Sequence, residues 1–164
     1  MSEKYSFQVG DFVVYPTHGV GKILSEDIEE YSGIRIVVYV ITFENSNMTL
    51  RVPKSRACKG GLRPLSSDQL LEKAFSILSG KKIKLNKGMW SKRVQQYENK
   101  INSGDIIAIS EVIKELHSNI EKSERSYSEK MIYNDAIDRL AGEYAATYKV
   151  EISEAINKIN NKLG

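Results

Sequence analysis

The spacing of apolar residues changes once along this chain of 164 residues, and the change limits which folds are possible. As far as Pro53 the apolar residues come in short β-branched and aromatic runs, of which Ile34–Phe43 (IRIVVYVITF) is the strongest. From Ser67 onward they recur every three or four residues, which is the period of one helix face. The sequence therefore predicts an α+β protein, in which a β module precedes a compact all-α domain.

The β module is expected to hold about four or five short strands. They are predicted at residues 11–15, 21–30, 34–43 and 48–52. Gly19-Val20-Gly21 is best explained as a bend between strands, because no helix follows it as a dinucleotide-binding loop requires. Several short strands joined by tight turns favour a small curled sheet or barrel.

The second half predicts about five helices, each with one apolar face. They are expected at residues 67–79, 90–103, 105–122, 126–148 and 152–163. Gly60-Gly61 and Pro64 punctuate the stretch before them, as is typical of a connecting segment. We therefore predict three parts: a β module at 1–59, a linker at 60–66 and a helical domain at 67–164.

Signatures of an enzyme are absent from the sequence. Cys58 is the only cysteine, and His18 and His117 lie in different modules without further ligands at metal-site spacing. We expect neither a metal nor a cofactor, and we expect His117 to be exposed because it lies off the apolar face of its helix. The longest apolar runs are too short to cross a bilayer, so the expected location is the cytoplasm.

The net charge of +3 is concentrated in one segment, Lys81–Gly104. This segment holds seven basic residues against one acidic residue, and it also holds the only tryptophan, Trp90. Lysine and arginine neutralise phosphates, and an aromatic ring can stack on a base or enter between base steps. The segment is therefore a candidate for binding nucleic acid.

A purely structural interpretation of the same segment stays open on spacing alone. Trp90, Val94, Tyr97 and Ile101 follow one another at helical spacing and would share one face. A tryptophan on such a face usually belongs to the core, and a run of charges usually forms a solvated surface.

Longer motifs make the chain resemble a known family. The run Val9–Gly21 (VGDFVVYPTHGVG) and the element Leu50-Arg51-Val52-Pro53 resemble the N-terminal half of the CarD/CdnL family of bacterial transcription regulators. Trp90-Ser91-Lys92-Arg93, with Asn99–Asp105 after it, resembles the tryptophan helix and the following turn in the second half of that family. The resemblance covers nearly the whole chain in the same order.

The resemblance implies a function. In that family a Tudor-like β barrel docks on the β subunit of RNA polymerase, and the helical domain contacts promoter DNA at the upstream edge of the bubble, which stabilises the open complex. Carried over to this chain, the wedge is Trp90, with Lys92 and Arg93 on the DNA backbone and Arg51, Val52 and Pro53 on the polymerase. Lys84 and Lys87 of the basic segment are expected to add non-specific DNA contacts, with a merely solvated loop as the alternative. A monomer associated with the nucleoid through the polymerase is expected.

Two parts of the sequence depart from the family pattern. Gln95 stands where relatives often have a basic residue, and the acidic run Glu26–Glu30 stands where relatives can place a basic polymerase contact.

Two other functions stay open. One alternative function is an adaptor that recruits polymerase without touching DNA. The other is a repressor that binds a defined operator by itself, for which no base-reading helix is evident.

Overall fold

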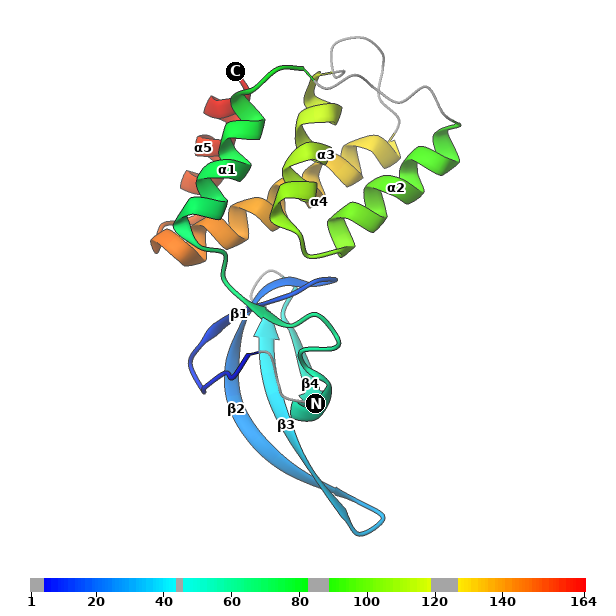
Figure 1. Cartoon of the computed structure of the whole chain (residues 1–164), viewed down its shortest axis with the longest axis vertical. Helices are drawn as coiled ribbons and strands as arrows, with labels where there is room; N and C mark the ends of the chain where they lie inside the picture. The colour runs from blue at the N-terminus through cyan, green and yellow to red at the C-terminus, as the bar shows by residue number, and fades with distance from the viewer. Residues whose placement is uncertain (1–4, 44–45, 83–88, 119–126) are drawn as a thin grey trace. The chain divides into compact units, whose positions relative to one another are not determined.

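The computed structural model describes residues 5–43, 46–82, 89–118 and 127–164, apart from the side chain of Trp90. The chain forms two compact units that divide between Leu65 and Ser66, and each is described by itself. Strands make up the first unit and helices the second, so the predicted α+β class is confirmed (Figure 1).

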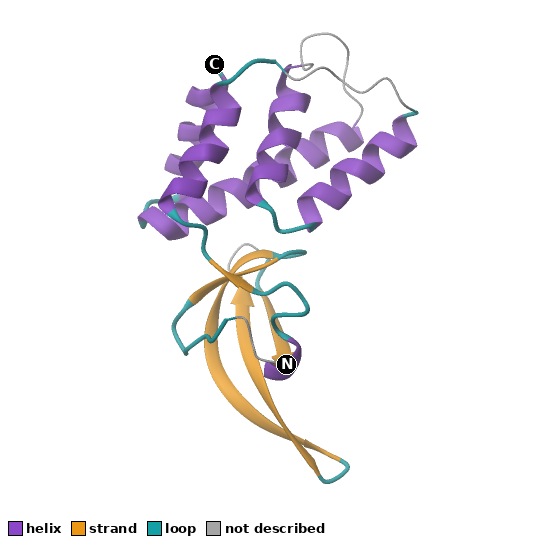
Figure 2. Cartoon of the chain, in the orientation of Figure 1, coloured by secondary structure: helices purple, strands orange, loops and turns teal. Residues whose placement is uncertain are grey.

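The first unit is a five-stranded antiparallel sheet in the order β4-β3-β2-β1-β5. Figure 2 shows its strands in orange. Its strands are β1 (Phe12–Tyr15), β2 (Gly19–Tyr31), β3 (Ile34–Phe43), β4 (Met48–Pro53) and β5 (Arg63–Pro64). All the predicted strands are present, and β3 has the predicted bounds. The sheet agrees with a Tudor-like module.

The sheet curls where β2 crosses the core. A bulge between Ile23 and Ser25 shifts the pairing with β3, which bends the strand. At Gly21 an added Cβ would lie 2.7 Å from side-chain carbons of Ile41 and Phe43, so only glycine lets β2 pass this close to β3. The enclosed core consists of Phe7, Val13, Ile23, Tyr39, Ile41, Phe43, Val52, Ala57 and Leu62.

The segment that we predicted as a linker contributes a strand to the sheet. Arg63 and Pro64 form β5 and pair with Val14 and Val13 of β1. Gly61 has a φ of 92°, and an added Cβ would lie 2.6 Å from Pro16. Gly61, one of the two glycines that indicated a connector, therefore serves a close approach of two segments, which no local pattern reveals.

The second unit contains five helices among the described residues. They are α1 (Asp68–Ser79), α2 (Trp90–Asn102), α3 (Ile106–Ser118), α4 (Tyr127–Tyr148) and α5 (Ile152–Leu163). All five predicted helices are confirmed within a residue or two, although residues 119–122 of the third lie outside the described part of the chain. No described helix has the length and apolar content that crossing a membrane requires.

Polar side chains close both ends of α1. The hydroxyl of Ser67 accepts a hydrogen bond from the Leu70 amide at the N-terminus, which satisfies one of the amides that a helix leaves unpaired. At the other end Lys114 of α3 is buried and donates from Nζ to the Leu78 carbonyl at 2.8 Å. An ammonium group at a helix C-terminus also complements the helix dipole.

Our prediction that His117 is exposed is wrong. Its ring is half-buried and stacks on Tyr133 of α4, and Nδ1 lies 3.0 Å from the Tyr133 hydroxyl. The apolar side chains of α3 lie in the core, but α4 also covers the flank of that helix. The periodicity of one helix cannot show where a second helix will pack.

Candidate functional site

An open groove of about 760 Å³ runs beside β4, an edge strand of the sheet. It is lined by Tyr15, Leu50, Arg51, Val52, Pro53, Ser55, Arg56, Lys59 and Gly60. Among the described residues, the lining therefore contains three cationic side chains and no carboxylate. Because β4 pairs with β3 alone among the described strands, it is an edge strand, and such an edge presents unpaired backbone groups.

The two cations that sequence reasoning missed are Arg56 and Lys59. Arg56 ends the short 3₁₀ helix Lys54–Arg56, and Lys59 follows in the next turn. Both side chains are exposed. They were missed because the turn that folds back towards β4 is set by its contacts with the sheet and carries no periodic signal.

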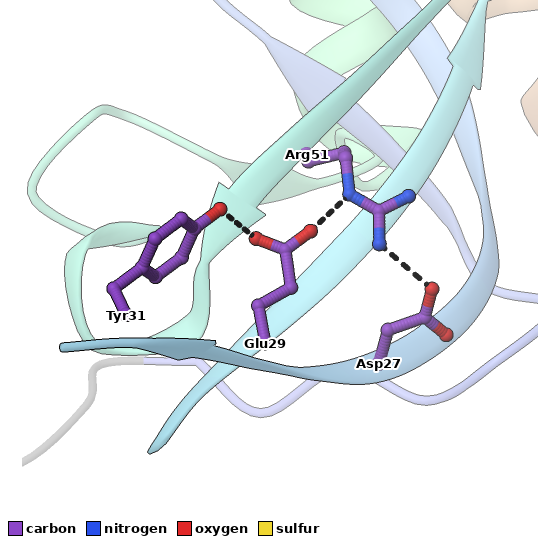
Figure 3. A network of polar contacts seen from close by, with 4 residues as sticks. All are labelled: Asp27, Glu29, Tyr31 and Arg51. Carbon is purple, nitrogen blue, oxygen red and sulfur yellow. Dashed lines mark hydrogen bonds and ion pairs between the residues drawn. The ribbon is translucent and has the colours of Figure 1, made fainter. Parts of the chain in front are cut away.

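Arg51, the predicted polymerase contact, is held by two carboxylates of the acidic run (Figure 3). Its Nη2 lies 3.0 Å from Oδ2 of Asp27, and its Nε donates to Glu29. The Tyr31 hydroxyl donates to the second oxygen of Glu29. The hydrogen bonds from Tyr31 and Arg51 hold the pKa of the Glu29 carboxyl below its ordinary value, so Glu29 faces Arg51 as an anion.

The acidic run is thus part of strand β2. Its members point alternately to the two faces of the sheet, as strand geometry requires. Asp27 and Glu29 face Arg51, whereas Glu26 forms an ion pair of 3.0 Å with Lys54. The run therefore partly neutralises the cations beside β4.

The other two predicted docking residues differ in what they can offer a partner. Val52 is buried, and its side chain belongs to the core of the β module. Pro53 is half-buried at the end of β4 and lines the groove. At Val52 only the backbone edge is accessible to a partner.

In the helical unit, Trp90 begins α2, directly after Met89. The Met89 side chain is 70% exposed, so a large apolar group stands at the start of this helix. Lys92 in the first turn is exposed, as are Lys81 and Lys82. The predicted DNA contacts Lys84 and Lys87, and the side chain of Trp90, lie outside the described part of the structure.

Arg93 differs from its neighbour Lys92. It is half-buried, and its Nε is shielded from solvent. Burial raises the pKa of the Tyr97 hydroxyl. Arg93 lowers this pKa and Glu115 of α3 raises it further, so the three polar groups lie close together. Arg93 therefore takes part in the packing of α2 on α3.

A second cation of α2 also faces an acid of α3. Lys100 lies 3.5 Å from the Glu111 carboxylate. Gln95, at the position where relatives often have a basic residue, is exposed and donates its amide to Asn99 at 3.0 Å. Among the described residues of α2, Lys92 is the cation best placed to meet a phosphate.

Both units match known families. A family model described as "CarD-like/TRCF RID domain" matches residues 7–66, and one described as "CarD, C-terminal domain" matches residues 73–160. The chain is also 30% identical over 138 residues to a "Putative transcription factor YdeB" of Bacillus subtilis (strain 168), an alignment covering 84% of this chain and 89% of that protein. Together with the sheet and the five helices, these matches show that the chain belongs to the CarD-like family of transcription regulators.

Proposed function

We propose that this protein docks on the β subunit of RNA polymerase through its β module and stabilises the open promoter complex through its helical domain. The observation that carries the docking half is the basic groove beside the edge strand β4. The DNA half rests on the position of Trp90 at the start of α2 and on family membership. The protein would act as a monomer in the cytoplasm, on the nucleoid, where it meets the polymerase.

The groove suits an extended acidic segment of the polymerase. An extended peptide can add to an exposed sheet edge by main-chain hydrogen bonds, while neighbouring pockets select its side chains. Here the backbone of Arg51, Val52 and Pro53 would supply the edge. Arg56 and Lys59 would attract carboxylates, which accelerates encounter and disfavours basic partners.

The proposed wedge acts by differential affinity. A tryptophan that fits only an unstacked junction binds the open promoter better than the closed one, and only such a difference shifts the equilibrium between them. Stacking of a base on an aromatic ring contributes roughly 1–3 kcal/mol, which corresponds to a shift of about 5- to 150-fold. This range is sufficient to regulate a promoter but too small to melt DNA unaided.

Phosphate contacts would supply affinity without reading sequence. The exposed Lys81, Lys82 and Lys92 are suited to this role, and Lys84 and Lys87 are proposed to join them. The amides of the first turn of α2 add a partial positive charge at the same place. Arg93 would contribute less than the resemblance implies, because it packs against α3.

The test uses the whole chain and purified core RNA polymerase. We expect the chain to capture the polymerase, and we expect heparin-challenged open complexes to decay more slowly in its presence. Capture with an unchanged open-complex lifetime would favour the adaptor function. This is the main competitor, because Arg93 is half-buried and Lys100 pairs with Glu111 of α3. Failure of capture would exclude both functions.

A further inference from the structure

The N-terminal cap of α2 is occupied by a residue that is poorly suited to close a helix. The Met89 carbonyl accepts the backbone N–H groups of Lys92 and Arg93, with N···O distances of 3.1 Å, so Met89 is the cap residue. At this position a side-chain oxygen ordinarily accepts an amide of the first turn, and serine, threonine, aspartate and asparagine are preferred. A thioether is only a weak acceptor, and in the described part of the chain no side-chain hydrogen bond closes this end of α2.

Two other helices of the same unit begin with an oxygen acceptor. The Ser67 hydroxyl accepts the Leu70 amide at the start of α1, and Oδ1 of Asp105 accepts the Ile107 amide at 2.9 Å at the start of α3. The first turn of α2 also contains no acid, and Lys92 places a positive charge there against the helix dipole. Both the cap and the charge at the start of α2 therefore lower the stability of this helix.

Packing of the Met89 side chain does not compensate for the missing cap. The side chain is 70% exposed, whereas a hydrophobic staple would bury it against the first turns of the helix. In the described part of the chain, Met89 is not among the residues that form or border the helical core. Positions that break a local rule without a structural gain are commonly functional. The fold of the helical unit thus gives no reason for a methionine at this position.

We propose that Met89 is a second apolar contact to promoter DNA, which enters the minor groove next to the base step that Trp90 opens. The proposal rests on the proposed function and adds a residue to its DNA-binding site. Consecutive Cα atoms lie roughly 3.8 Å apart, close to the rise of roughly 3.4 Å between stacked bases, so neighbouring residues can reach neighbouring steps. The exposed cations Lys81, Lys82 and Lys92 of the same unit complement the phosphates of this partner.

The chemistry of methionine suits such a contact. Methionine is one of the apolar side chains that proteins insert between base steps from the minor groove. Its unbranched, polarizable thioether adapts to irregular gaps, as expected beside a partly unstacked junction. An oxygen-bearing cap residue would strengthen α2 but would present a polar group to the faces of the bases. Met89 therefore exchanges some stability of α2 for an apolar contact with DNA.

Met89→Ser separates the stability of the helix from the contact with DNA. The substitution supplies the missing acceptor and removes the apolar group. We expect the melting temperature of the whole chain to rise by roughly 4 °C. The lifetime of heparin-challenged open complexes should fall by about three- to tenfold, because the buried apolar contact is lost. A lower melting temperature, or a higher one with an unchanged lifetime, would overturn the proposal.

Two further variants serve as controls for Met89→Ser. Met89→Leu keeps an apolar side chain and adds no cap, so the lifetime should stay within about twofold of that of the unsubstituted protein. Met131→Ser removes a methionine of α4 that is 53% exposed and should leave the lifetime unchanged. Losses as large as that of Met89→Ser in either control would contradict a specific apolar contact at Met89.

The contact can also be tested in the unsubstituted protein with forked DNA alone. In protein labelled with ¹³C at the methionine methyl groups, we expect nuclear Overhauser effects from the Met89 methyl to base and sugar protons at the junction, and none from Met131. If the DNA shifts the Lys92 amide signal but gives no such effect at Met89, this inference fails while the proposed function stands. If the chain does not bind forked DNA, the DNA half of the proposed function fails, and the contact at Met89 fails with it.

Discussion

The two basic surfaces of this protein differ in how many of their cations are available to a partner. In the groove, Arg56 and Lys59 are exposed while Arg51 is held by Asp27 and Glu29. In α2, Lys92 is exposed, while Arg93 is half-buried beside Tyr97 and Lys100 pairs with Glu111 of α3. The local excess of charge is larger in the second segment, yet acids from other elements offset both surfaces. Local charge in a sequence is therefore a poor measure of available charge.

The largest expected effect concerns Trp90, which we place at the contact with DNA. In Trp90→Ala the open-complex lifetime should fall by about 5- to 150-fold, because the stacking contribution is lost. Thermal stability should change little if the ring is a wedge, whereas truncating a core tryptophan costs about 3–5 kcal/mol. Heparin-challenged decay and a thermal melt measure the two quantities. Ile101→Ala, which truncates a buried neighbour on the same helix, is the destabilising control.

The second prediction concerns the available cations of the groove. Reversing both charges in Arg56→Glu/Lys59→Glu should weaken polymerase binding by about tenfold or more, because an acidic segment would then meet like charge. Binding of the full chain to core polymerase, measured by biolayer interferometry, tests this. Arg35→Glu, an exposed reversal on β3 away from the groove lining, should leave binding unchanged. Equal losses in both variants would indicate a general charge effect and contradict a specific groove.

The third prediction compares neighbouring cations of α2. Lys92→Gln should reduce the slope of log K against log salt for forked DNA by about 1, as expected when one phosphate contact is lost. Arg93→Gln should change that slope less but lower the free energy of unfolding by about 1 kcal/mol, because Arg93 packs against α3. DNA titrations at several salt concentrations and urea unfolding separate the two. A full unit of slope lost in Arg93→Gln would restore Arg93 as a phosphate contact.

The smallest effect is expected where acids restrain a cation of the groove. Asp27→Asn/Glu29→Gln should strengthen polymerase binding by about two- to fivefold, because exposed ion pairs are weak and their loss frees Arg51 for an acidic partner. Glu30→Gln, a neighbour on the opposite face of β2, is the matched control. Weaker binding of the double variant would mean that the carboxylates themselves contact the polymerase. The partner segment would then have to be basic, in contradiction to the acidic segment proposed.

Much of the fold could be predicted from the sequence because its signals are local. The β-branched run at Ile34–Phe43 and the apolar spacing at 152–163 define β3 and α5 with their observed bounds. These patterns depend on backbone geometry within one element, which neighbouring residues suffice to specify. The motifs around Tyr15 and Trp90 likewise identified the family, since such motifs can be read directly along the chain.

The tertiary structure decided what these local signals could not. β5 exists because β1 offers it a pairing edge, and His117 is half-buried because α4 packs across α3. Arg51 is restrained by acids from a distant part of the chain, Arg93 lies beside Tyr97, close to Glu115 of the next helix, and Ser66 is held by a carboxylate 77 residues away. The sequence alone determined which residues could carry charge and which elements they lie on. Which charges remain available to a partner was decided only by folding, because neutralisation depends on distances in space that sequence separation does not set.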